Sequence, residues 1–297
     1  MSHAAGEGRP CVFYVMGAGR SGSTTLGIAL GNCDEVFFAG ELDNWLVRSA
    51  RPQVEDDERL AFWAAVRERL EDPGAAEALF GNEAQRAIER SMSLLRLNKW
   101  AARRRLGPRY RSVAADLYRA VARVAGTQRI ADTSHYPLRA AQLQRIEEID
   151  LYLVFLVRDP QGVVASFDRH DVGEFTKSKL HTNLYLWVTH LLSTIVFLRA
   201  PRERRLLVRY EQFLADPTAT LAAILAMAGV ELDPPPDFDA LRVGMPLQGN
   251  RVTRSKTLTL KVGTDPVPRV SLPTKLLQGP AMAVLARLRP SLATRGD

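Results

Sequence analysis

The sequence predicts an α/β fold in which one mostly parallel central sheet is covered by helices on both faces. Two apolar runs support this prediction: residues 11–16 and residues 151–157 have the length and composition of buried strands. Each run leads into a polar loop and then into a helical pattern, and the same order recurs along the chain. Repeated strand, loop and helix indicate parallel βαβ units, so we expect a single three-layer domain.

The other expected elements follow from the same patterns. Shorter strands are expected at residues 35–38, 129–132 and 205–210, and helices at residues 24–30, 111–124, 137–149, 178–198 and 217–228. Helical periodicity also fills residues 56–105, with breaks near residues 72–74 and 81. We divide the single domain, residues 1–297, into a flexible N-terminus at 1–10, a helical insert at about 45–127 and an irregular C-terminal segment at 234–297.

Composition narrows the class of protein. The chain has 297 residues, of which 46% are hydrophobic and 25% charged, as in ordinary soluble globular proteins. Its net charge of +7 indicates an anionic ligand or partner, although arginine-rich helices alone would also produce it. Cys11 and Cys33, the two cysteines, exclude a disulfide framework. Residues 1–10 lack the apolar core of a signal peptide and no stretch is apolar enough to span a bilayer, so we expect a cytoplasmic protein.

A glycine-rich loop follows the first predicted strand. Residues 17–25 read Gly-Ala-Gly-Arg-Ser-Gly-Ser-Thr-Thr, and backbone N–H groups of such loops point at anions. Residues 17–22 match the dinucleotide-binding motif GxGxxG, and Glu41 follows about 20 residues later, where that motif expects an acidic residue. They also match a triphosphate-binding loop, except that Ser23 stands in place of its lysine. Because the cation has moved to Arg20, the loop suits a ligand of lower charge that is held without a metal.

A second candidate loop follows the strand predicted at residues 151–157. Asp159 is expected to cap the next helix and Pro160 to start it. Ser166 then lies about two turns along that helix, where it and Arg158 can reach one phosphate. Ligands of parallel sheets bind at the carboxyl ends of the strands, so both loops should lie at the same edge of the sheet.

The pairing of these two loops resembles the sulfotransferases that use 3′-phosphoadenosine 5′-phosphosulfate (PAPS). In that family, arginine or lysine precedes Ser-Gly-Ser/Thr-Thr in the phosphosulfate loop, and Arg-Asp/Asn-Pro with a later serine binds the 3′-phosphate. Residues 208–217 resemble a third family segment, with Gln212 in place of an aspartate. Residues 249–256 resemble the segment that closes over the nucleotide.

The resemblance implies a P-loop-like sulfotransferase fold, PAPS as co-substrate, no metal and a set of nucleotide-binding residues. In chain order these residues are Gly19, Arg20, Ser21, Gly22, Ser23, Thr24, Thr25, Arg158, Ser166, Tyr210, Asn250 and Arg254. Tyr210 would lie near the adenine, or it would be a core tyrosine at a strand end. Asn250 and Arg254 would belong to the 3′-phosphate site, or to a plain solvated loop.

Two residues compete for the role of general base, and Arg20 completes the predicted catalytic set. Glu41 follows the second predicted strand, and the resemblance implies that it is the base; the alternative is a carboxylate at a helix N-terminus. His135, in the segment Asp-Thr-Ser-His at residues 132–135, stands where many relatives have a lysine that stabilises the leaving oxygen. It can take that role when protonated or as a hydrogen-bond donor, or it can act as the base.

We therefore expect a PAPS-dependent sulfotransferase acting by in-line attack on a hydroxyl of a carbohydrate, lipid or natural-product acceptor. The runner-up is an NAD(P)-dependent oxidoreductase with a Rossmann loop. A polyanion-binding module is a weaker third hypothesis, because the arginines are scattered and only 7% of residues are aromatic. The expected partner is thus a small-molecule, glycan or lipid acceptor and no nucleic acid, the insert should build its pocket, and the oligomeric state is left open.

Overall fold

The computed structural model describes residues 8–48, 50–167 and 179–261, together with residue 263 and residues 278–279, 282–283 and 285–288. Its centre is a five-stranded parallel sheet in the order β2-β3-β1-β4-β5. The strands are β1 (Cys11–Gly17), β2 (Val36–Gly40), β3 (Arg129–His135), β4 (Asp150–Val157) and β5 (Arg205–Arg209). The predicted α/β fold with a mostly parallel sheet is confirmed.

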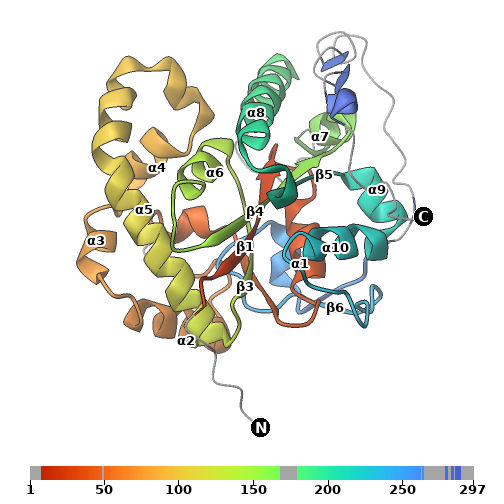
Figure 1. Ribbon diagram of the computed structural model, residues 1–297, viewed down its shortest axis with the longest axis horizontal. Helices are drawn as coiled ribbons and strands as arrows, with labels where there is room; N and C mark the ends of the chain where they lie inside the picture. The colour runs from red at the N-terminus through yellow and green to blue at the C-terminus, as the bar shows by residue number, and fades with distance from the viewer. Residues whose placement is uncertain are drawn as a thin grey trace.

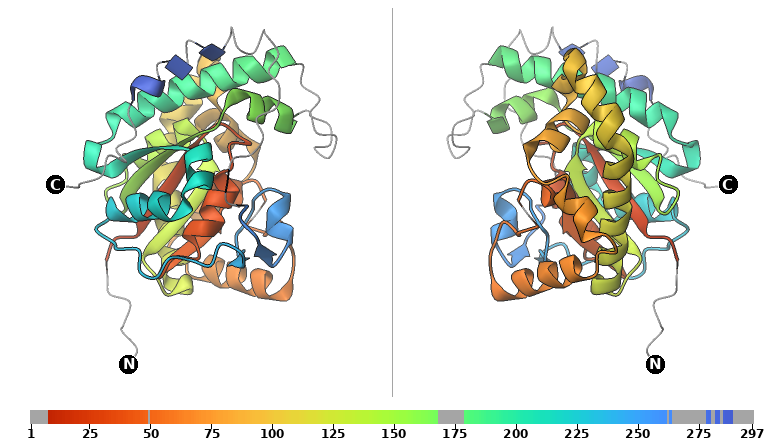
Figure 2. Two further views of the ribbon diagram at one scale, coloured as in Figure 1. Left: turned by 90° about the vertical axis from the view of Figure 1, so that its right-hand side faces the viewer. Right: turned by 90° about the vertical axis from the view of Figure 1, so that its left-hand side faces the viewer.

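Helices cover both faces of the sheet (Figures 1 and 2). One face packs against α2 (Asp57–Glu68), α5 (Leu97–Ala125), α6 (Pro137–Leu143) and α8 (Lys179–Arg199), and the other against α1 (Ser23–Leu30), α9 (Tyr210–Ala215) and α10 (Pro217–Ala226). Side chains of β1 alternate between the two cores: Val12 and Tyr14 point to the first, Phe13 and Val15 to the second. Burial on both faces explains why the strand reads as a continuous apolar run.

The helical insert lies along one side of the sheet and comprises α2, α3 (Pro73–Glu77), α4 (Asn82–Ile88), the short 3₁₀ helix η2 (Ser91–Leu95) and α5 (Figure 1). The expectation of a helix beginning at residue 111 was wrong, because α5 is one helix of 29 residues that continues through Pro108. Proline has no N–H, so the carbonyl of Arg104 lacks the hydrogen bond that residue 108 would otherwise donate. Both residues are exposed, so water can donate to that carbonyl instead. Buried side chains such as Tyr110 and Tyr118 then hold the continuous helix against the core.

Other boundaries shift by a few residues. The helix α6 ends at Leu143 rather than 149, and β3 extends to His135. Beyond residue 234, regular structure is as sparse as expected: β6 (Leu241–Arg242) pairs with β7 (Thr257–Leu258), and η4 (Arg251–Arg254) is one 3₁₀ turn. Hydrogen bonds from Leu247 N to Ala39 O and from Glu41 N to Gln248 O fasten this segment beside the end of β2. Within the described ranges, no helix is both long and apolar enough to cross a membrane.

Candidate functional site

A cavity of about 620 Å³ opens where the carboxyl ends of β1, β2 and β3 meet. Most of the residues predicted for the site contribute to its lining. They are Gly19, Arg20, Gly22, Ser23, Thr24, Glu41, His135, Asn250 and Arg254. The glycine loop, the two candidate bases and the C-terminal segment are therefore brought to one place, as the sheet-edge argument requires.

The glycine loop leads into α1 with an open helix N-terminus. Gly22 is the N-cap, with φ at 93°, and a Cβ there would lie 2.2 Å from Cε2 of Tyr210. Both the left-handed backbone and the packed tyrosine ring therefore require glycine at this position. No side chain caps α1, and no acidic residue lies in its first turn. Its first N–H groups are thus oriented for an anionic ligand beside the guanidinium of Arg20.

The second loop contacts the first directly. Nη1 of Arg158 donates to the carbonyl oxygen of Arg20 at 3.3 Å, and the Arg158 guanidinium lies 4.7 Å from the centroid of the Tyr210 ring. A Cβ on Gly162 would lie 3.0 Å from Nε of Arg158, so the side chain runs close over the start of α7 (Pro160–Phe167). The two loops that sequence analysis paired are therefore in contact.

The helix start after Arg158 forms as expected. Oδ1 of Asp159 accepts from the N–H of Gln161 at 2.8 Å, and α7 begins at Pro160. The Asp159 N–H donates to Oε1 of Glu211 at 2.9 Å, which joins this loop to α9. Ser166 lies half-buried on the last turn of α7.

Part of the predicted set is not among the described residues that line the cavity. Among the described lining residues, the following are not found: Ser21, Thr25, Arg158, Ser166 and Tyr210. Ser21 is buried, and its hydroxyl has no hydrogen-bond partner among the described residues. Tyr210 supports the loop through its ring against Gly22, so its packing role is evident.

Glu41 reaches the cavity from the turn that ends β2. Gly40 has φ at 78°, and a Cβ there would lie 2.2 Å from the carbonyl oxygen of Gln248. The Glu41 N–H donates to that same oxygen at 2.8 Å, which fixes the turn. Burial, and then the charge of Asp132, raise the pKa of Glu41 to about 7, while Arg20 lowers it. A carboxyl group with this pKa can take up a proton near neutral pH.

His135 occupies a tight turn at the end of β3. Its φ is 54°, and the N–H of Tyr136 donates to the carbonyl of Ser134 at 2.7 Å across it. Such a backbone is strained for a residue with a Cβ and needs support from its surroundings. Burial, and then the charge of Arg90, lower the pKa of His135 to about 4. The imidazole is therefore neutral at pH 7, which does not favour the protonated role considered from sequence.

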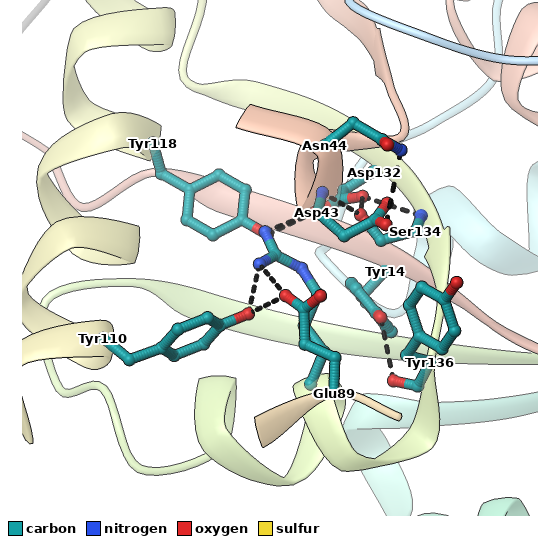
Figure 3. Close-up of polar contacts among 10 residues, drawn as sticks. Tyr14, Asp43, Asn44, Glu89, Tyr110, Tyr118, Asp132, Ser134 and Tyr136 are labelled. Atoms are coloured by element: carbon teal, nitrogen blue, oxygen red, sulfur yellow. Dashed lines mark hydrogen bonds and ion pairs between the residues drawn. The ribbon is translucent and has the colours of Figure 1, made fainter. Parts of the chain in front are cut away.

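Beneath the cavity lies a cluster of buried charges and tyrosines, which we call the buried network: Glu89, Tyr110, Tyr118, Asp132 and Arg139 (Figure 3). Arg139 pairs with both carboxylates, at 3.2 Å from Nη2 to Oδ2 of Asp132 and 3.2 Å from Nη1 to Oε1 of Glu89. The Tyr118 hydroxyl donates to Asp132 at 2.6 Å, and the Tyr110 hydroxyl donates to Glu89. One guanidinium and two phenols thus bond to the two carboxylates, while Oε2 of Glu89 has no hydrogen-bond partner among the described residues.

The buried network also connects the two candidate bases. Oδ1 of Asp132 accepts from the N–H of Ser134 at 2.8 Å and from its hydroxyl. Oγ of Ser134 in turn accepts from the N–H of Asp43 at 3.0 Å. The segment preceding His135 is therefore tied to the turn that follows Glu41 (Figure 3). Sequence analysis noted residues 132–135 only for His135 and missed that Asp132 and Ser134 position both loops.

Sequence analysis also missed several lining residues. These are Gln53, Arg90, Tyr136, Phe167, Thr182 and Tyr185, whereas Gly249 and Arg251, which also line the cavity, lie in the C-terminal segment already singled out. Tyr185, on α8, accepts a hydrogen bond from the N–H of Gly19 at 2.9 Å and so closes one side of the glycine loop. The six missed residues belong to no recognisable motif.

The donor set of the cavity suits a phosphorylated ligand. One part of the wall holds Arg20, the hydroxyls of Ser23 and Thr24 and an uncapped helix N-terminus, and the exposed Arg254 also lines the cavity. Among the described side chains, no group of three or more His, Cys, Asp and Glu residues is arranged to hold a metal ion.

Comparisons with known proteins agree with this geometry. Residues 10–234 match the model of one protein family, described as the sulfotransferase family. Among solved structures, the sulfotransferase domain of the Synechococcus PCC 7002 olefin synthase is similar at a TM-score of 0.54 and 20% identity, covering 96% of this chain and 98% of that one. The sulfotransferase domain from the curacin biosynthetic pathway follows at 0.51 and 16% identity, covering 93% and 98%. No curated protein matches the sequence significantly.

Proposed function

The chain belongs to the sulfotransferase family, and we propose that it transfers a sulfuryl group from PAPS to a hydroxyl of a carbohydrate, lipid or other natural-product acceptor. The observation that carries the proposal is the contact between the two phosphate loops, through the Arg158 guanidinium and the Arg20 carbonyl. A dinucleotide oxidoreductase has no need for this second cationic loop, and the family match favours the sulfotransferase interpretation.

PAPS, when bound, supplies the sulfuryl group and leaves as 3′-phosphoadenosine 5′-phosphate (PAP). Arg20 and the start of α1 would hold the phosphosulfate through the loop N–H groups and the hydroxyls of Ser21, Ser23, Thr24 and Thr25. Arg158 and Ser166 would hold the 3′-phosphate, with Asn250 and Arg254 closing over it from the C-terminal segment. Tyr210 would lie beside the adenine.

The chemistry required of the protein is proton removal and charge stabilisation. Glu41 would take the proton from the acceptor hydroxyl, because its raised pKa of about 7 makes it a competent base near neutral pH. His135, neutral at this pH, would donate a hydrogen bond rather than act as a cation. Arg20, which faces Glu41 closely enough to lower its pKa, would stabilise negative charge on the leaving oxygen.

Calorimetric titration with PAP tests the donor half of this proposal. We expect saturable binding to the wild-type chain and an affinity reduced about 10-fold to 100-fold in Arg158→Ala, because charge-assisted hydrogen bonds to a phosphate are lost. Arg145→Ala, which removes an exposed arginine after α6, is the matched control and should bind PAP as the wild type does. Absence of saturable PAP binding, or preferential binding of NAD(H) or NADP(H), contradicts the proposal.

Transfer itself is measured with labelled PAPS and a panel of hydroxyl acceptors. We expect label to appear in an acceptor and PAP to form in equal amount. If PAP binds but no hydroxyl accepts the label, the nucleotide-binding half of the proposal stands and the transfer half is contradicted.

A further inference from the structure

The helical insert contributes two of the described lining residues of the cavity, Gln53 and Arg90. The Gln53 side chain is already engaged, since its Oε1 accepts from the N–H of Gly249 at 3.3 Å. Arg90 is exposed, and its guanidinium lies 5.1 Å from the centroid of the Tyr136 ring. The insert therefore presents one cation, stacked on one aromatic ring, to the cavity.

Arg90 has no counter-charge among the residues that the structure describes. Its side chain makes no hydrogen bond and no ion pair within the described ranges, and its guanidinium contacts the Tyr136 ring. Glu41, the carboxylate of the described lining, has its pKa lowered by Arg20 rather than by Arg90. The Arg90 guanidinium instead stacks on Tyr136, the residue after His135, so it lies at the His135 end of the cavity.

The positions of Arg90 and Tyr136 are fixed from below. Glu89, the residue before Arg90, is buried and bonded to Arg139 and Tyr110 of the buried network. The carbonyl of Tyr136 accepts from the Tyr14 hydroxyl at 2.9 Å (Figure 3). These anchors hold the backbone next to Arg90 and at Tyr136, and the contact between guanidinium and ring pairs the two side chains, which lowers the entropy lost on binding a ligand.

We propose that Arg90 is the acceptor-recognition residue, and that the acceptor carries an anionic group of its own, a carboxylate or a phosphate, near the hydroxyl that is sulfated. This inference rests on the proposed function. Tyr136 directly follows His135, so an anion on Arg90 places the rest of the acceptor between His135, Glu41 and the glycine loop. A guanidinium suits either anion, since both accept paired hydrogen bonds from its planar N–H groups.

Three matched aromatic alcohols test the proposal: para-(hydroxymethyl)benzoate, its uncharged carboxamide, and para-(hydroxymethyl)phenyl phosphate. Their binding to the PAP-loaded protein is measured by calorimetry, and transfer is measured with labelled PAPS. We expect at least one anionic compound to bind about 10-fold to 100-fold more tightly than the carboxamide. The carboxylate and phosphate arms show which anion the site prefers.

Arg90→Gln should reduce that preference to about 1, and Arg90→Lys should retain part of it, because a point charge remains without the planar fork. Arg105→Gln removes an exposed arginine of α5 outside the cavity and should keep the wild-type preference. Saturable PAP binding by each variant shows that the chain is folded. If Arg90→Gln does not fold, the anion preference is measured with Arg90→Lys instead.

Equal binding of the charged and uncharged compounds, or a preference that persists in Arg90→Gln, overturns the role of Arg90. Either result leaves the proposed sulfotransferase function intact as long as PAP binds. Failure of the wild-type chain to bind PAP is the separate outcome that removes the proposed function.

Discussion

The cavity wall and the buried network beneath it carry opposite excesses of charge. The described part of the wall contains one carboxylate, Glu41, and four arginines, which are Arg20, Arg90, Arg251 and Arg254. In the buried network, Glu89 and Asp132 share the single guanidinium of Arg139, and the carboxyl of Asp43 lies close by. The wall is cationic and open to solvent, and the layer below it is acidic and dry.

The difference follows from the free energy of hydration. An arginine in an open cavity keeps its water until an anionic ligand replaces it, so an excess of cations there is tolerated and useful. A carboxylate without water must be paired or protonated, and burial accordingly raises the pKa of Asp43 well above its ordinary value. Glu41 lies between the two layers, where burial and then the charge of Asp132 raise its pKa and Arg20 lowers it.

The largest effect is expected for Glu41→Gln. Removing the general base should lower kcat by about 100-fold to 10,000-fold while saturable PAP binding remains, measured by labelled transfer and calorimetry. Glu147→Gln, at an exposed position between α6 and β4, is the matched control and should keep wild-type kcat. If Glu41→Gln retains wild-type turnover, His135 becomes the remaining candidate for the base.

The same substitution has a predictable effect on stability. The pKa of Glu41 in the folded chain is about 7, above its ordinary value, so folding favours the protonated carboxyl and stability is lost as pH rises from about 4.5 to 7. Glutamine removes that cost, and the variant should melt at or above the wild-type temperature at pH 8. A variant that melts well below the wild type would indicate misfolding rather than loss of a base.

The next effect tests the dry layer. Arg139→Leu leaves two buried carboxylates without their shared cation and should lower the free energy of unfolding by about 3–5 kcal/mol, measured by urea denaturation. Arg145→Leu changes an exposed arginine just past the end of α6 and should shift it by less than about 0.5 kcal/mol. A loss in Arg139→Leu no larger than that of the control would mean that the phenols and protonation alone satisfy the carboxylates.

The two layers also differ in how far sequence could predict them. The two loops were predictable because their signals are local: Gly22 and the start of α1 after it, and the Asp159 cap of α7, each depend on neighbours in the chain. Parallel strand order then brings such loops to one edge without further information.

The buried network and the α8 side of the wall depend on distant partners. Gly19 and Tyr185 are 166 positions apart, and Asp43 and Ser134 are 91 positions apart. A tyrosine or serine that acts through such a contact has no periodicity or motif of its own. Arg90 is one arginine among many in the insert, and only the fold shows that it reaches the cavity while its neighbour Glu89 is buried.

The smallest expected effect is the pH dependence of kcat/KM, which follows from the opposing influences of Asp132 and Arg20 on the pKa of Glu41. For the free protein, kcat/KM for PAPS should rise about tenfold per pH unit up to about pH 7 and then level off, because the carboxylate form of Glu41 is the active one. His135, with a pKa of about 4, adds no second ionisation between pH 5 and 9. Initial rates with labelled PAPS across that range give the profile.

Arg20→Gln sharpens the same measurement. Arg20 lowers the pKa of Glu41, so its removal should move the midpoint of the profile to higher pH, in addition to any loss of rate from the donor site. The shift in midpoint separates an electrostatic role from loss of affinity, since weaker PAPS binding alone lowers the whole curve without moving it. Two results would assign the ionisation to a group other than Glu41: a midpoint that stays near pH 7 in Arg20→Gln, or a rise of kcat/KM with pH that persists in Glu41→Gln. Either result would contradict a pKa of Glu41 set by the cationic wall and the acidic layer.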